Sequence, residues 1–182
     1  MAFFLLIIYI YLIWGIVFYA KKRKAYDHFR YSISELGELG SEYEKQVSFF
    51  IFLPVGLGCL IVSIFTYANS YQAAFLAGAI GLSYLLSAFF PCDQGTPVFG
   101  TWKNSIHNIV GGGCYAGIAY QLNELMDKNT GWHIEASFTL LCIFIITFIV
   151  GFPKHFIGLI QRVAEASIFL STFLLLLDVT FT

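Results

Sequence analysis

Six long runs of apolar residues, separated by short polar segments, fill most of this 182-residue chain. Each run has roughly the 17–25 residues that an α-helix needs to cross about 30 Å of hydrocarbon. Backbone polar groups in lipid must be satisfied within the spanning segment, so helices are the expected structure. The pattern predicts six transmembrane helices, at residues 2–20, 47–67, 71–90, 106–125, 136–152 and 156–179.

Short signals at the ends of these runs support their boundaries. Residues 41–44, Ser-Glu-Tyr-Glu, have the pattern of a capping box just before the second run. Pro91 and Pro153 end the third and fifth runs, because proline cannot continue a helix comfortably. Small residues that repeat every four positions predict faces of close helix packing in lipid. These are Ala73, Ala77 and Gly81 in the third run, and Gly113 and Gly117 in the fourth.

The composition indicates that lipid is the solvent for much of the surface. Hydrophobic residues make up 58% of the chain and charged residues only 12%, against about 25% charged residues in a typical soluble domain. A chain this short cannot hide so many large apolar side chains in a core. We therefore predict an all-α integral membrane bundle that forms one domain over residues 1–182. The four cysteines are scattered without a CxxC pair and predict no disulfide framework.

Basic residues fall almost entirely on one side of the predicted bundle. With six crossings, nine of the ten Lys and Arg residues share a side, and Lys128 lies on the other. The nine are Lys21, Lys22, Arg23, Lys24, Arg30, Lys45, Lys103, Lys154 and Arg162. The positive-inside rule makes their side cytoplasmic, so both termini are expected outside. The net charge of −1 gives no indication of a nucleic-acid partner.

A first polar patch lies where the third and fourth runs meet on the cytoplasmic side. Asp93 follows Pro91, and His107 and Asn108 open the next run. A carboxylate and an imidazole at the mouth of a bundle are candidates for an acid–base pair or for ligands of a divalent metal. Two ligands are too few to identify a metal. In the structural alternative, Asp93 caps the fourth helix and His107 hydrogen-bonds within the packing.

A second polar patch opens the last run, where Arg162 and Glu165 lie within the span. Ionisable groups inside a span are costly and are candidates for a functional site. The two residues can pair within the helix. Alternatively, Arg162 meets Asp93 or Glu35 from elsewhere, and Glu165 is left for chemistry. Arg162 at the inner interface also suits a lipid phosphate, and a simple anchoring role competes with that interpretation.

The loop after the first run carries a third group of polar residues. Ile33 and Leu36 interleave with the polar positions of residues 31–37. This pattern is expected of a segment that lies at the level of the lipid headgroups or dips back into the membrane. An ordinary interfacial connector is the plainer interpretation of the same residues.

Four short motifs, taken in order, resemble a known family. They are YSISELG at 31–37, FPCDQG at 90–95, SIHN at 105–108 and GLIQRVAE at 158–165. Together they resemble, over about residues 26–175, the small six-span membrane proteins of bacteria and archaea catalogued as domain of unknown function number 998. The resemblance implies a prokaryotic inner (cytoplasmic) membrane and supplies no reaction. It implies that the characteristic polar positions, all at cytoplasmic helix ends, are Ser34, Glu35, Asp93, His107, Arg162 and Glu165.

The favoured function is lipid handling at the inner leaflet, with membrane lipids as partners, either by an embedded enzyme or by a lipid-binding protein. Asp93 and His107 then activate water or hold a divalent metal, and Glu35 or Glu165 serves as acid or base. The residues expected to bind the ligand are Arg162, Ser34 and Asn108.

Two other functions remain open. The chain is alternatively a non-catalytic accessory subunit that docks on another membrane protein through its polar face. The third function, a small transporter, lacks the charged residue expected near the middle of a span. A haem held by His107 and His155 has no further supporting signal in the sequence.

Overall fold

The computed structural model describes residues 1–128, 131–151 and 154–181, and these residues form helices and no strands. The long helices are α1 (Ala2–Lys22), α3 (Leu53–Thr66), α4 (Tyr71–Phe89), α5 (Trp102–Met126), α6 (Trp132–Val150) and α7 (Ile157–Phe181). The shorter elements are η1 (Ser34–Gly37), α2 (Glu44–Val47), η2 (Ser48–Phe52) and η3 (Lys154–Phe156). Because α2, η2 and α3 follow one another without a break, they form a single helix over Glu44–Thr66.

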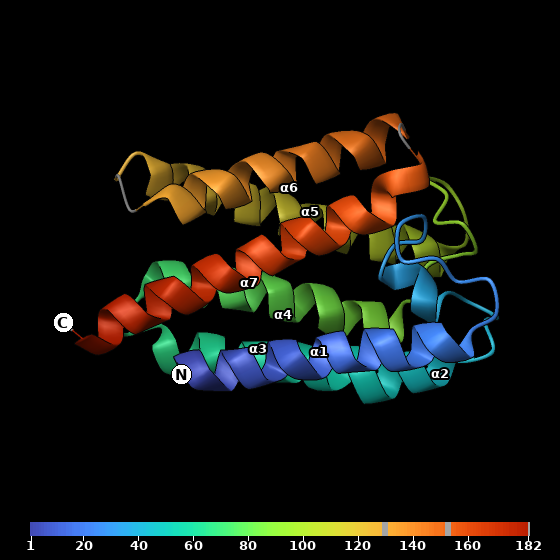
Figure 1. The fold of residues 1–182 in the computed structure, drawn as a ribbon, viewed down its shortest axis with the longest axis horizontal. Coiled ribbons are helices and arrows are strands. Elements are labelled where there is room, and N and C mark those ends of the chain that lie inside the picture. Colours follow the sequence, from blue (N-terminus) through green and yellow to red (C-terminus); the bar gives the residue numbers. More distant parts are fainter. Residues whose placement is uncertain (129–130, 152–153, 182) are drawn as a thin grey trace.

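The helices run roughly along the long axis of one elongated bundle (Figure 1). Helix α4 lies centrally and packs on α3, α5 and α7, while α6 packs on α5 and α7, and α1 packs on α3 and α7. Both termini lie at one end of the bundle. The loops that precede α2 and α5 lie at the opposite end, which we call the loop end. The polar motifs of the sequence therefore gather at the loop end.

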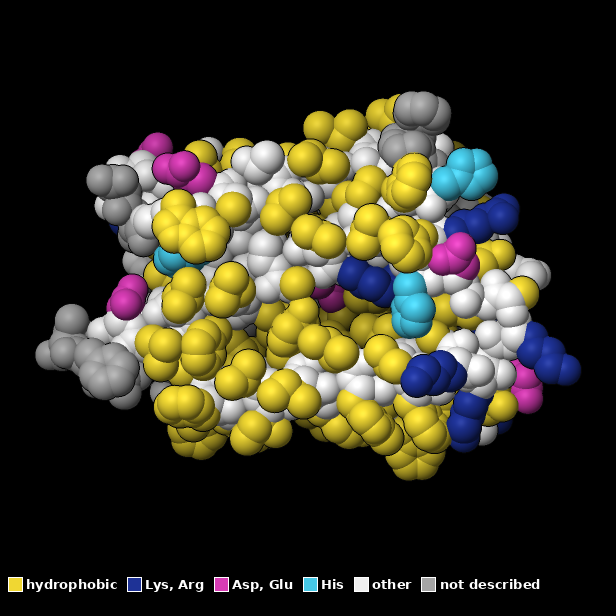
Figure 2. Space-filling view, in the orientation of Figure 1, with side chains coloured by type: hydrophobic (Ala, Val, Ile, Leu, Met, Phe, Trp, Pro, Cys, Tyr) yellow, Lys and Arg dark blue, Asp and Glu magenta, His cyan; other side chains and the backbone are white. Residues whose placement is uncertain are grey.

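In the part of the chain that the structure describes, five helices are long and apolar enough to cross a membrane, namely α1, the joined helix over Glu44–Thr66, α4, α6 and α7. The chain is thus a multi-pass helical membrane protein, and the predicted fold class is confirmed. Apolar side chains cover the flanks of the bundle, whereas Lys and Arg side chains gather at the loop end (Figure 2). Helix α5 has 25 residues but is more polar, so its crossing stays a prediction. The N-out, C-out orientation and the single-domain assignment also stay predictions.

The helix ends agree with the sequence to within a few residues, and most differences have a local cause. Helix α5 begins four residues before the predicted span, because the Thr101 hydroxyl accepts a hydrogen bond from the Asn104 N–H, at 3.3 Å. Helix α6 ends at Val150, because Gly151 adopts a left-handed conformation with φ of 68°. The predicted stop at Phe152 and Pro153 lies outside the described residues.

Pro54 explains the irregular turn within the second membrane helix. Over Ser48–Phe52 the backbone is π-helical, and the Leu53 N–H bonds the Ser48 carbonyl, five residues back. Pro54 has no N–H to give to the Phe50 carbonyl one turn earlier. The hydroxyl of Tyr11 on α1 donates to that carbonyl instead. A backbone group left without its usual helical donor thus links two helices.

The predicted capping box at residues 41–44 does not form. The Ser41 hydroxyl has no hydrogen-bond partner in the described part of the chain, and the Glu44 carboxylate accepts from the Gly40 N–H instead, at 2.7 Å. A reciprocal pair of this kind occurs earlier, between Ser32 and Glu35. The Ser32 N–H donates to Glu35 Oε2 at 2.6 Å, and the Glu35 N–H donates to Ser32 Oγ at 3.2 Å.

The small-residue face predicted for α4 is confirmed as a packing surface. Ala73 and Ala77 are fully buried, and a Cβ atom added to Gly81 would lie 2.9 Å from the Gly56 carbonyl of α3. The corresponding prediction for α5 fails at Gly113, which has open space around it. The close approach of two helix backbones therefore occurs between α3 and α4.

This contrast predicts opposite effects for two alanine substitutions. In Gly56→Ala, the new Cβ would meet the Leu85 backbone N at 2.6 Å, so the helices must separate and stability should fall by about 1–3 kcal/mol. In Gly113→Ala, nothing lies within 4 Å, and stability should rise by up to about 1 kcal/mol. Thermal unfolding in detergent measures both changes. Equal effects of the two substitutions would contradict the packing described.

Candidate functional site

A carboxylate lies inside the bundle, where helices α4, α5 and α7 meet. Glu165 on α7 has only 6% of its surface exposed. It accepts hydrogen bonds from the Tyr84 hydroxyl of α4 and from the Tyr115 hydroxyl of α5, at 2.5 Å. The side-chain amide of Gln161, one turn earlier on α7, donates a third bond at 3.0 Å. Three donors fit an acceptor-only carboxylate, and each comes from a residue within a helix.

Gln161 connects this carboxylate to the loop end of the bundle. Its side-chain oxygen accepts a hydrogen bond from the Ile33 N–H at 2.7 Å. Ile33 and Leu36 are 3% and 0% exposed, so residues 26–38, which we call the covering segment, dip into the end of the bundle. The segment is therefore packed into the bundle, while its depth in the membrane stays a prediction.

Two small pockets adjoin Glu165, and each has room for about one water molecule. Both are lined by Ser83, Tyr84, Tyr115 and Glu165. The polar pocket lies beneath the covering segment and is lined in addition by Ile33, Ser34, Phe52, Ser87 and Gln161. The apolar pocket lies deeper in the bundle and is lined in addition by Ile80, Ile118, Ile168 and Phe169. A single carboxylate therefore stands between a polar and an apolar space.

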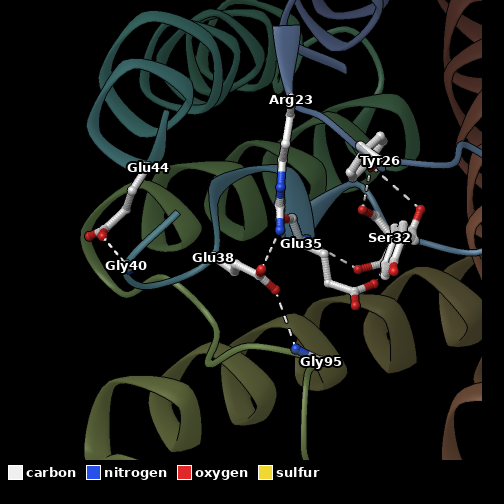
Figure 3. A network of polar contacts seen from close by, with 9 residues as sticks. Arg23, Tyr26, Ser32, Glu35, Glu38, Gly40, Glu44 and Gly95 are labelled. Carbon is white, nitrogen blue, oxygen red and sulfur yellow. Dashed lines mark hydrogen bonds and ion pairs between the residues drawn. The ribbon is translucent and has the colours of Figure 1, made fainter. Parts of the chain in front are cut away.

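Glu35 makes hydrogen bonds within the covering segment, with Ser32 (Figure 3). Burial raises the pKa of the Glu35 carboxyl, and its hydrogen bonds with Ser32 oppose that shift. Arg23 donates to the Glu35 carbonyl and pairs with the Glu38 carboxylate. The other oxygen of Glu38 accepts from the Gly95 N–H at 3.3 Å. Glu38 therefore links the end of the covering segment to the loop before α5, and Glu35 holds the segment's own turn.

Arg162 fastens the covering segment to α7. Its Nη1 donates to the carbonyls of His28, Tyr31 and Gly158 at 2.8–2.9 Å, and its Nη2 donates to the Tyr26 hydroxyl at 2.7 Å. Burial raises the pKa of Tyr26 to about 12 although Arg162 opposes the shift, so this hydroxyl keeps its proton at neutral pH. In the described residues, no carboxylate lies within 4 Å of Arg162. Its partners are neutral oxygens rather than Glu165, Glu35 or Asp93.

Asp93 and Asn108 hold the loop that leads into α5. The Asp93 carboxylate accepts from the N–H and the hydroxyl of Thr101, at 2.7 and 2.8 Å. Asn104 and Asn108 both donate to the Pro97 carbonyl, at 2.8 and 2.9 Å. These contacts give Asp93 a structural role, but the N-cap of α5 is Thr101, which Asp93 holds in place.

His107 packs against the end of α4, away from Asp93. Its Nδ1 lies 2.9 Å from the carbonyl of Phe90, the residue that follows α4, and in the described residues no hydrogen bond or ion pair joins it to Asp93. Within the described ranges, no group of three or more His, Cys, Asp and Glu side chains could hold a metal ion. The metal hypothesis stays a prediction that rests on two residues.

The predicted site residues therefore fall into separate groups. Ser34 and Glu165 line the polar pocket, whereas the other candidates hold the covering segment or the loop before α5. The sequence analysis missed Tyr84, Tyr115 and Gln161 as partners of Glu165. A signal was present, since each carries a polar group inside an apolar run. Which of these polar side chains come into contact depends on the orientation of each helix about its own axis in the bundle.

Two substitutions test how the covering segment is held on α7. A Cβ atom at position 158 would collide with the Tyr31 carbonyl and lie 2.7 Å from the His28 carbonyl, so Gly158→Ala should displace the segment. Arg162→Lys should loosen it by about 1–3 kcal/mol, because an ammonium cannot serve all four acceptors. Tryptic cleavage at the exposed Arg30 should accelerate in both variants. Gly111→Ala, with open space around position 111, is the control and should cleave like the wild type.

Comparison with known proteins identifies the family to which this chain belongs. No curated protein and no solved structure matches this chain. The family model described as "Protein of unknown function (DUF998)" matches residues 5–178. This match includes every candidate site residue named above and all of the long helices except the first residues of α1 and the last residues of α7. The chain is therefore a member of the DUF998 family, as its four motifs suggested.

Proposed function

We propose that this protein binds a membrane amphiphile, with the polar group of the ligand at Glu165 and its apolar part deeper in the bundle. The pair of pockets that share Glu165 carries this proposal. Ligand sites are typically apolar spaces with a few convergent polar groups. Here the polar groups lie toward the loop end, and the apolar lining lies beyond them. This order matches a lipid whose headgroup is at the interface and whose chain points to the bilayer centre.

The orientation of the bundle fits a ligand from the inner leaflet. The basic residues gather at the loop end, which the positive-inside rule makes cytoplasmic. We therefore place the protein in a prokaryotic cytoplasmic membrane, with its termini outside and the Glu165 site below the inner interface. Exposed basic side chains at that level also attract anionic headgroups.

Glu165 is the residue to which we assign ligand recognition or acid–base chemistry. Tyr84, Tyr115 and Gln161 hold its carboxylate in place. Asp93, Asn108 and Arg162 maintain the frame around it, because their contacts are to backbone and hydroxyl groups. A ligand larger than water needs the η1 turn or neighbouring side chains to move, so the covering segment controls entry.

Native mass spectrometry of the protein in mild detergent tests this proposal. The wild type should carry one amphiphile, and Glu165→Gln should lower its retention about tenfold, because a hydrogen bond to a charged group contributes about 1.5–3 kcal/mol. Ser83→Leu should also displace the ligand, since Ser83 lines both pockets.

The control is Glu135→Gln, which makes the same chemical change at an exposed position on α6. It should retain the amphiphile. A wild-type protein without any bound amphiphile, or ligand retention that is equal in all variants, would refute the proposal.

One surface favours a second function, that of an accessory subunit. The loop before α5 exposes Val98 and Phe99, which are 60% and 90% exposed. Asn104 and Asn108 hold this loop firmly through the Pro97 carbonyl. Exposed apolar side chains on a well-fixed loop suit contact with another membrane protein.

Phe99→Ser tests the second function in protein extracted from native membranes. If the chain is an accessory subunit, one partner polypeptide should co-purify in stable proportion and should be lost from this variant. Phe65→Ser removes a side chain that is 65% exposed on α3 and should keep the partner. Extraction of the wild type without a second polypeptide would exclude the accessory role under those conditions.

A further inference from the structure

We propose that the polar pocket binds a single sodium ion, with Glu165 as its one charged ligand. This inference does not rest on the amphiphile proposal, although both involve Glu165 and the polar pocket. The lining brings together oxygen atoms from the η1 turn, from α4 and from α7. Hard cations prefer such oxygen ligands. The space matches one water molecule, and a bare sodium ion is of similar size.

Three serine hydroxyls in this pocket are available as ligands. Ser34, Ser83 and Ser87 line the pocket, and they make no hydrogen bond to the described part of the chain. Hydroxyls elsewhere in the helices behave differently. Those of Thr66 and Thr172 donate to the carbonyls of the preceding turn, at 2.7 and 2.8 Å. Ser34, Ser83 and Ser87 are partly exposed rather than buried, and their hydroxyl oxygens are free to act as ligands of an occupant.

The charges around the pocket favour a monovalent cation. Glu165 is the only Asp or Glu in the pocket lining, and in the described residues no ion pair within 4 Å neutralises it. An uncompensated buried carboxylate is costly, and one positive charge restores neutrality. A divalent ion would leave a net positive charge in the same space.

The direction of α4 also favours a cation at this place. Helix α4 ends at Phe89, so Ser87 lies in its last turn and Ser83 lies one turn earlier. The C-terminal end of a helix carries partial negative charge and stabilises cations nearby. Because Ser34 belongs to the covering segment, a bound ion would also join this segment to the bundle.

Thermal unfolding of the full-length protein in detergent tests the proposal. At constant pH and ionic strength, sodium chloride should raise the unfolding temperature in a saturable way relative to potassium and choline chloride. Ser87→Ala should weaken the apparent sodium affinity by about tenfold, through the loss of one ligand. Glu165→Gln should abolish the sodium effect. Ser167→Ala and Glu135→Gln change the same residue types outside the pocket and should keep it.

Several outcomes would overturn the sodium site. The first is an unfolding temperature that is equal in sodium and choline chloride. The second is a sodium effect that survives in both Ser87→Ala and Glu165→Gln. The third is an unfolding temperature that depends on pH but not on sodium, which would mean that Glu165 binds a proton instead of a sodium ion. If Glu165→Gln does not fold, Ser87→Ala and its control still decide, and lipid retention by the wild type separates this result from the amphiphile proposal.

Discussion

Polar groups inside a lipid-facing bundle must find their partners within the protein, and this constraint explains most of the contacts described. The Phe50 carbonyl, left without a donor by Pro54, accepts from Tyr11 on another helix. The Arg162 guanidinium, without a carboxylate partner in the described residues, collects backbone carbonyls. Glu165 collects two tyrosine hydroxyls and an amide. In each case a polar group that would be costly to leave unpaired fixes the relative positions of separate parts of the chain.

The same constraint changes the meaning of a polar motif. Asp93, His107 and Asn108 have the residue types of an active site, yet each one bonds the end of a helix or the loop beside it. Glu165 differs from them because free space adjoins it on two sides. Residue type alone therefore does not separate a structural frame from a site. The pockets beside Glu165 are the additional observation on which its proposed role rests.

Much of the fold could be predicted from the sequence because lipid imposes a simple rule. Apolar length gives the helices, and prolines or glycines such as Gly151 give several of their ends. Local chemistry was less predictable, since Ser32–Glu35 and the 41–44 segment share the same S-x-x-E pattern, and only the first forms reciprocal bonds. The partners of Glu165 were beyond prediction, because Tyr84 and Tyr115 lie 81 and 50 residues away in sequence. Pairing at that distance depends on the rotation of each helix, which apolar runs do not determine.

The position of α7 after its partners in the sequence has a consequence for biosynthesis. Chains fold from the N-terminus as they are made, so α7 emerges after the covering segment, α4 and α5. Until it inserts, Tyr84 and Tyr115 lack their shared acceptor, and the covering segment lacks both Gln161 and Arg162. A ribosome that stops before α7 would leave helices with unmet polar groups in the membrane. Insertion of α7 therefore completes these polar contacts between the helices and the covering segment.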